Sequence, residues 1–152
     1  VIPCNIYGPG DNYDVVNGHV IPSLIHKFYM AKEKGEDVTI WGSGNPLREF
    51  IFSEDVAKLT ELLYDNYTDG VPVILSTGDE ISIKDVVLLI AEIFEFKNKI
   101  HFDTEKPEGQ FRKPSDNSVI RNMFPDFKFT PIEEGLKKSI NWFIDNYPNL
   151  RK

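Results

Sequence analysis

Apolar and polar positions alternate along this chain in blocks that predict strands and helices in turn. The strand-like runs are short, apolar and bounded by turn residues, and they cover 1–7, 38–41, 49–52, 72–75 and 100–102. Helical segments, with apolar residues at three- and four-residue steps, are predicted over 19–34, from Ser53 to about Tyr64, after Ser82, over about 117–123 and after Pro131. Because strands and helices alternate, the pattern predicts an α/β fold.

The predicted helices carry recognisable end signals. Pro22 lies in the first turn of 19–34, and Gly35 follows its last residue. Ser53 and Ser82 are expected to be the N-caps of the next two helices, because a serine hydroxyl can accept a hydrogen bond from a first-turn N–H. The last helix is expected to bury one stripe, formed by Ile132, Leu136, Ile140, Phe143 and Ile144.

Composition narrows the class of protein. With 152 residues, 41% of them hydrophobic, the chain can bury one substantial core, and its net charge of −7 argues against a general nucleic-acid or anionic-membrane binder. No apolar stretch approaches the ~20 residues of a membrane span. A single cysteine, Cys4, rules out an internal disulfide framework and favours a reducing, cytoplasmic location.

The beginning of the chain is unusual. It opens on a strand-like run, VIPCNIY, with no initiating methionine and no secretory signal. We therefore expect a fragment whose first half is missing.

The stretch WGSGNPLREF, residues 41–50, carries the first candidate chemistry. An indole face can stack on a nucleotide base, and a guanidinium can bind a phosphate through two hydrogen bonds. Trp41 and Arg48 at the two rims of this turn could therefore bind a nucleotide. The alternative is a plain hairpin with a half-buried Trp41 and a surface Arg48, and the stretch alone leaves both open.

The second candidate is His19, at a predicted helix start directly after Gly18. Imidazole titrates near neutral pH, and the positive end of a helix dipole disfavours its charged form, so this position suits a general acid or base. The alternative is a helix-entry residue that makes one backbone hydrogen bond. The three histidines and one cysteine lack the spacing of a zinc site, so we expect no metal.

The remaining candidates are cations and the cysteine. The loop 103–118 carries Lys106, Arg112 and Lys113, which could form a lid over an anion or a solvated surface loop. Cys4 lies inside an apolar strand with no flanking cation, which predicts a small buried core residue and not a nucleophile. The turn after that strand would lie at the carboxyl edge of a sheet, where α/β folds bind ligands.

Taken in order, five segments resemble the C-terminal part of the GDP-L-fucose synthase family, which belongs to the extended short-chain dehydrogenases/reductases. The segments are IPCNIYGPGDNY, GHVIPSLIHKF, VTIWGSGNPLREFIFSEDVA, FDTEKPEGQFRKPSDNS and WFIDNY, and the resemblance runs from Val1 to about Lys152. It implies the end of a Rossmann-type sheet plus the smaller C-terminal α/β substrate-binding domain. It also implies NADP(H) as cofactor, GDP-4-keto-6-deoxy-D-mannose as substrate, GDP-L-fucose as product, and a homodimer in the intact protein.

The resemblance implies a role for each matching residue. Strand residues Pro3, Cys4, Asn5 and Ile6 would line the nicotinamide end of NADP(H), although the family usually has threonine where this chain has Cys4. His19 would be the catalytic acid that protonates the sugar, and it would also border the cofactor. The substrate would be bound by Lys27, Trp41, Arg48, Lys99 and Lys113.

The family's glycine-rich phosphate turn, its Ser–Tyr–Lys group and its epimerase cysteine all precede the matching region. None of them occurs in this sequence, so residues 1–152 are expected to be inactive alone and to lack the N-terminal cofactor-binding half. Two alternatives stay open: another nucleotide-sugar enzyme of the superfamily, such as a 4,6-dehydratase or a 4-epimerase, and a non-catalytic GDP-sugar-binding module.

Overall fold

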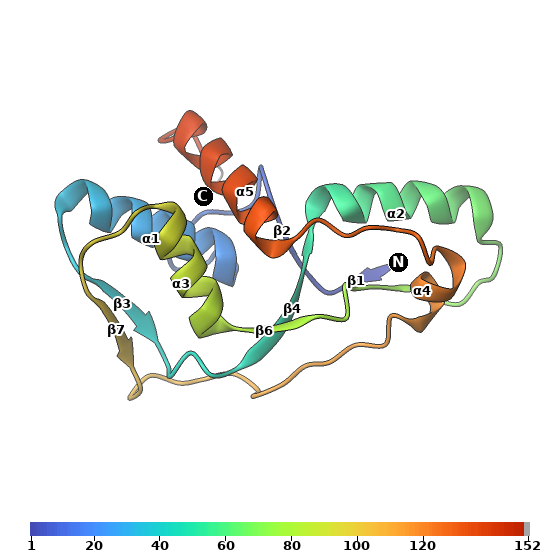
Figure 1. Ribbon diagram of the computed structural model, residues 1–152, viewed down its shortest axis with the longest axis horizontal. Helices are drawn as coiled ribbons and strands as arrows, with labels where there is room; N and C mark the ends of the chain where they lie inside the picture. Colours follow the sequence, from blue (N-terminus) through green and yellow to red (C-terminus); the bar gives the residue numbers. More distant parts are fainter. Residues whose placement is uncertain (151–152) are drawn as a thin grey trace.

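A computed structural model describes residues 1–150, so the last two residues of the predicted domain lie outside the described part. Strands and helices alternate in it, which confirms the predicted α/β class (Figure 1). The elements are β1 (Ile2–Pro3), β2 (Asn5–Tyr7), α1 (Val20–Lys34), β3 (Val38–Trp41), β4 (Leu47–Phe52), α2 (Ser53–Asn66), β5 (Ile74–Leu75), β6 (Glu80–Ser82), α3 (Ile83–Ile93), β7 (Ile100–Asp103), α4 (Ser118–Met123) and α5 (Ile132–Asn146).

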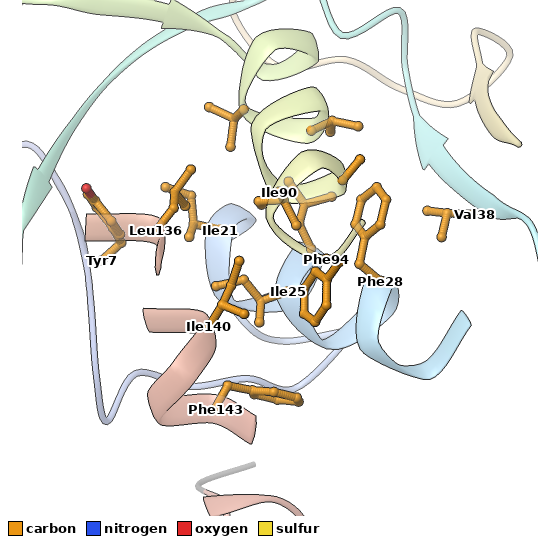
Figure 2. Close-up of a cluster of buried hydrophobic side chains, with 14 of the residues drawn as sticks. Tyr7, Ile21, Ile25, Phe28, Val38, Ile90, Phe94, Leu136, Ile140 and Phe143 are labelled. Atoms are coloured by element: carbon orange, nitrogen blue, oxygen red, sulfur yellow. The ribbon is translucent and has the colours of Figure 1, made fainter. Parts of the chain in front are cut away.

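Within the described residues the strands form three small sheets. β1 pairs with β5 and β3 with β7, both in parallel, while β4 lies between parallel β2 and antiparallel β6. β4 joins two hydrophobic cores, because successive side chains of a strand point to opposite faces. Phe50 and Phe52 pack into the core under α1, α3 and α5, whereas Ile51 packs into the core beneath α2. Figure 2 shows the first core, to which α1 contributes Phe28, α3 contributes Ile90 and α5 contributes Phe143.

The caps of two helices follow the predicted signals. α1 ends at Gly35, whose φ of +68° suits glycine, and its N–H donates to the carbonyls of the preceding turn. Ser82 caps α3 by accepting a hydrogen bond from the Asp85 N–H at 3.0 Å. Gly35 therefore ends α1, and His19 is the N-cap directly before its first residue, Val20.

Other predictions about the strands need correction. The run 1–7 is two strands, because the chain bends at Cys4 and changes its pairing partner from β5 to β4. The stretch 41–50 is not a hairpin, since β3 pairs with β7 while β4 pairs with β2 and β6. Gly42 and Gly44, at φ of +83° and +77°, direct the chain from one sheet to the next. The short strand β6 was not predicted, and β5 covers only the end of 72–75.

Two helix predictions are also wrong. Phe52, not Ser53, is the N-cap of α2, because the chain passes from β4 into the helix without an intervening turn. Ile144 does not belong to the buried stripe of α5, since it is 45% exposed while Phe143 is fully buried. One residue turns a helix by about 100°, which carries Ile144 away from the core.

Candidate functional site

Two adjoining cavities lie at the carboxyl ends of β2 and β3. The first, of about 770 Å³, is lined by Asn5, Ile6, the turn 8–11 and His19. The second, of about 500 Å³, is lined by Lys27, Trp41 and residues 107–109. Arg48 lines both cavities, as do Gly18 and Val20, so one ligand could extend from the first cavity into the second.

The loop before α1 positions His19. The Asp14 carboxylate accepts hydrogen bonds from the N–H groups of Val16 and Asn17, and the Gly18 N–H donates to the Asp14 carbonyl at 2.9 Å. A Cβ at Gly18 would lie only 2.4 Å from the Asp14 carbonyl oxygen, so this turn requires glycine. These contacts fix the backbone of the loop and place His19 at the rim of the first cavity.

The imidazole of His19 is accessible to a ligand. His19 is the N-cap of α1, yet its side chain makes no capping hydrogen bond to the described residues, and it is 79% exposed. Its Nδ1 lies 3.6 Å from Oδ1 of Asp11. The ring therefore has one nitrogen near a carboxylate while it borders the first cavity and stays accessible to a ligand. The helix-entry alternative, a histidine occupied by one backbone hydrogen bond, is not what the structure contains.

Trp41 lies close to two ammonium groups. Its ring is 66% exposed, and the Nζ atoms of Lys27 and Lys106 lie 5.7 and 5.9 Å from its centroid. Partial burial lowers the pKa of Lys27. Arg48 is half-buried, and its Nη1 donates to the Leu47 carbonyl at 2.6 Å. An exposed aromatic face beside three cations is suited to a base and its attached phosphates.

The structure does not bring every candidate residue to this place. Cys4, Asn5 and Ile6 line the first cavity, but Pro3 lies outside both cavities as the described residues form them. Lys99 and Lys113 are exposed and line neither cavity.

Two other side chains singled out from the sequence have local partners. Arg112 of the loop 103–118 donates to Glu80 at 2.6 Å, so this cation is engaged in an ion pair. Burial raises the pKa of the Cys4 thiol to about 11. A thiol that stays protonated at neutral pH is a poor nucleophile, as predicted for Cys4. The predicted core position is only partly correct, because Cys4 is half-buried, packing against the second core while also lining the first cavity.

Sequence reasoning missed a buried carboxylate next to Arg48. Glu49 is 2% exposed, and it accepts hydrogen bonds from the hydroxyls of Ser76 and Ser115 and from the Ser115 N–H at 3.1 Å. Burial alone would raise the pKa of Glu49, but these hydrogen bonds outweigh it and hold the pKa below 4.5. The available signal was an acid inside the apolar run 47–52, where a charge needs partners.

Replacing Glu49 by glutamine is expected to cost about 1–2 kcal/mol of stability at pH 7, because one carboxamide oxygen replaces two charged acceptors. The carboxylate contributes stability that is present above pH 4.5 and is lost as the pH falls through its lowered folded pKa. Denaturant unfolding of full-length wild type and Glu49→Gln should therefore differ at pH 7 and converge in acid. Equal stability of the two proteins at pH 7 would show that the charge of Glu49 and its hydrogen bonds contribute nothing to the free energy of unfolding.

Residues 1–150 contain neither a cluster of metal ligands nor a membrane-spanning helix. Between residues 1 and 150, no three His, Cys, Asp or Glu side chains gather closely enough to bind a metal ion. None of the helices described is both long enough and apolar enough to cross a membrane.

Comparison with known proteins confirms the resemblance that the motifs predicted. The chain is 53% identical over 154 residues to a GDP-L-fucose synthase of Dictyostelium discoideum, a match that covers 100% of this chain and 48% of that protein. The crystal structure of a GDP-L-fucose synthetase from Naegleria fowleri bound to NADP superposes with a TM-score of 0.97 at 41% identity, covering 100% of this chain and 48% of that one. The chain thus spans about half the length of these relatives.

A 4-epimerase of another nucleotide sugar is more distant. A UDP-N-acetylglucosamine 4-epimerase from Methanobrevibacter ruminantium has a TM-score of 0.78 at 26% identity, covering 95% of this chain and 45% of that one. These structures confirm the Rossmann-type, extended short-chain dehydrogenase/reductase fold class. The model of the NAD dependent epimerase/dehydratase family matches residues 1–78, more than half of the sequence, and the chain therefore belongs to that family.

Proposed function

We propose that residues 1–152 are the C-terminal portion of a GDP-L-fucose synthase, mostly its substrate-binding domain. The intact protein would use NADPH for 3,5-epimerisation and 4-reduction of GDP-4-keto-6-deoxy-D-mannose to GDP-L-fucose. The observation that carries this proposal is the meeting of two cavities at Arg48, one bordered by His19 and the other by Trp41 and Lys27. The cofactor-binding half would lie outside this chain, which would be inactive alone, and the intact enzyme would be a cytoplasmic homodimer.

The first cavity fits the nicotinamide end of NADP(H). Its wall is an exposed apolar side chain, Ile6 at 39% exposure, beside Asn5 and the turn 8–11, which suits a flat ring with one polar edge. The Asn5 side chain donates to the Glu49 carbonyl at 2.7 Å, so this wall is fixed to β4. When bound, NADPH would supply the hydride that reduces the C4 ketone.

In this proposal, residues of this chain bind the sugar nucleotide and carry out one proton transfer. A 4-keto group acidifies the hydrogens at C3 and C5, so inversion needs a base on one face and an acid on the other. His19 can be that acid, because its ring borders the first cavity and stays accessible while Asp11 lies beside Nδ1. Trp41 would stack on the guanine, and Lys27 and Arg48 would bind the diphosphate.

The test uses the full-length protein with GDP-4-keto-6-deoxy-D-mannose and NADPH, following cofactor oxidation and identifying the sugar product. Formation of GDP-L-fucose would establish the proposal. Without NADPH oxidation, conversion of a nucleotide hexose that retains its C4 and C6 hydroxyls would favour a 4-epimerase or a 4,6-dehydratase, because neither reaction consumes reduced cofactor in net terms. GDP binding without NADPH oxidation would favour a non-catalytic binding module.

The closer likeness supports the synthase over these alternatives. Identity to the GDP-L-fucose synthetase structure is 41%, against 26% for the 4-epimerase. A 4-epimerase or a 4,6-dehydratase also has no need of an acid at the position of His19.

Arg48→Ala is expected to raise KM for the sugar nucleotide about 10- to 100-fold in the full-length enzyme, with little change in kcat. The guanidinium would bind a phosphate that is present in ground and transition state alike, so its loss weakens binding uniformly. Steady-state kinetics would check this, with Lys58→Ala as a charge-matched control on the exposed face of α2. Lost kcat with unchanged KM would contradict the proposed role.

A further inference from the structure

Residues 103–115 run beside residues 42–49 and contact them at successive points (Figure 1). The N–H groups of Gly42 and Leu47 donate to the carbonyls of Asp103 and Phe111, each at 2.8 Å. Between these two bonds the Glu108 carboxylate accepts from the Ser43 N–H. We call residues 103–115 the covering segment; its far end is fixed by the hydrogen bonds of Ser115 to Glu49.

The turn 42–44 is shaped to bind the Glu108 carboxylate. Gly42 and Gly44 both have positive φ, a conformation in which successive N–H groups can converge on an anion. The Ser43 hydroxyl and the N–H groups of Ser43 and Gly44 lower the pKa of Glu108. A Cβ at Gly42 would lie 2.7 Å from Cγ and Oε1 of Glu108, and the φ of +83° favours glycine at this position.

The contact places the covering segment against the second cavity. Pro107, Glu108 and Gly109 line that cavity together with Trp41 and Arg48. Gly109 lies so close to Arg48 that an added Cβ would be 3.1 Å from its Nη2. Displacing Glu108 would therefore move the chain that faces the guanidinium.

We propose that Glu108 is a positioning residue for the sugar nucleotide. By binding the turn 42–44, its carboxylate keeps residues 106–109 against the cavity, so that Trp41, Lys106 and Arg48 have one arrangement before the ligand arrives. Glu108 itself contacts no reacting atom. The identity of the ligand rests on the proposed function, whereas the contact between the covering segment and the turn 42–44 does not.

The experiment compares Glu108→Gln with Glu105→Gln in the full-length protein. Glu105→Gln is the matched control, because it makes the same charge change in the same segment. Glu105 is exposed and lines neither cavity. Glu108→Gln is expected to raise KM for the sugar nucleotide about five- to tenfold, because a charge-assisted contact is lost, while kcat and KM for NADPH stay unchanged. Hydrogen exchange over 42–44 and 104–111 should accelerate, and Glu105→Gln should match wild type.

A second variant guards against a folding defect. Glu108→Ala, which removes the carboxylate at an exposed position and leaves the turn 42–44 unchanged, should reproduce both the higher KM and the faster exchange. If Glu108→Gln has the KM of Glu105→Gln, the positioning role is wrong, whatever the exchange rates are. If wild type binds GDP without turnover, the proposed function fails, and the affinity of the two glutamine variants for GDP then decides the role of Glu108.

Discussion

His19→Gln is expected to lower turnover of GDP-4-keto-6-deoxy-D-mannose by about 10²- to 10⁴-fold in the full-length protein, which is the usual contribution of a positioned acid or base. Glutamine has a similar size and can donate a hydrogen bond, but it cannot give up a proton. The backbone should be undisturbed, because the His19 side chain makes no capping bond to the described part of the chain. NADPH should still bind, since Asn5 and Ile6 form the wall of that cavity.

The measurement is incorporation of solvent deuterium at C3 and C5 of the sugar, together with NADPH affinity. The matched control is His101→Gln, because His101 is also exposed and its Nε2 lies 3.0 Å from the Asp37 carboxylate, yet it lines neither cavity. His101→Gln should retain wild-type turnover. Deuterium incorporation at the wild-type rate in His19→Gln would contradict the acid role.

The parts of the site that lie at helix ends and turns could be predicted from the sequence. Glycine before His19, proline in the first turn and Gly35 at the end define α1 by local rules, and the structure follows them. Trp41 and Arg48 could be assigned to one binding site because only six residues separate them in the sequence. Local signals sufficed wherever the partners are neighbours in the chain.

The remaining features depend on contacts between distant residues. Glu49 meets Ser76 and Ser115, which are 27 and 66 residues away, and no local pattern specifies those partners. The charged loop is the same case. Its cations suggested a lid, and Lys106 does lie near Trp41, while residues 107–109 line the second cavity. Arg112, however, pairs with Glu80, and the acid Glu108 makes the contact to the turn 42–44.

Phe143→Ala is expected to destabilise the full-length protein by about 3–5 kcal/mol, the usual cost of removing a fully buried phenylalanine. Its ring is fully buried and lies 5.0 to 5.6 Å from four aromatic neighbours, namely Tyr13, His26, Tyr29 and Tyr147. Figure 2 shows Phe143 beside Ile140 at the edge of the first core. Because α1, α5 and the loop before α1 all meet at this ring, no single neighbour can move to fill the space.

Ile144→Ala is the matched control, since Ile144 is the next residue of the same helix and is 45% exposed. Chemical denaturation should place the Ile144→Ala variant within about 1 kcal/mol of wild type, because surface substitutions rarely cost more. Equal losses for the two variants would show that α5 does not pack as described.

Phe143→Ala should also affect the candidate site. Phe143 packs on Tyr13, and Tyr13 belongs to the loop that leads to His19. The Tyr13 hydroxyl donates to the Gly8 carbonyl at 3.2 Å, and the Tyr13 carbonyl accepts from Nδ1 of His26 at 2.8 Å. Loosening this loop would misplace His19, so kcat should fall even below the unfolding temperature, whereas Ile144→Ala should keep it. An unchanged kcat in folded Phe143→Ala would mean that the local hydrogen bonds of Asp14 are enough to fix the loop.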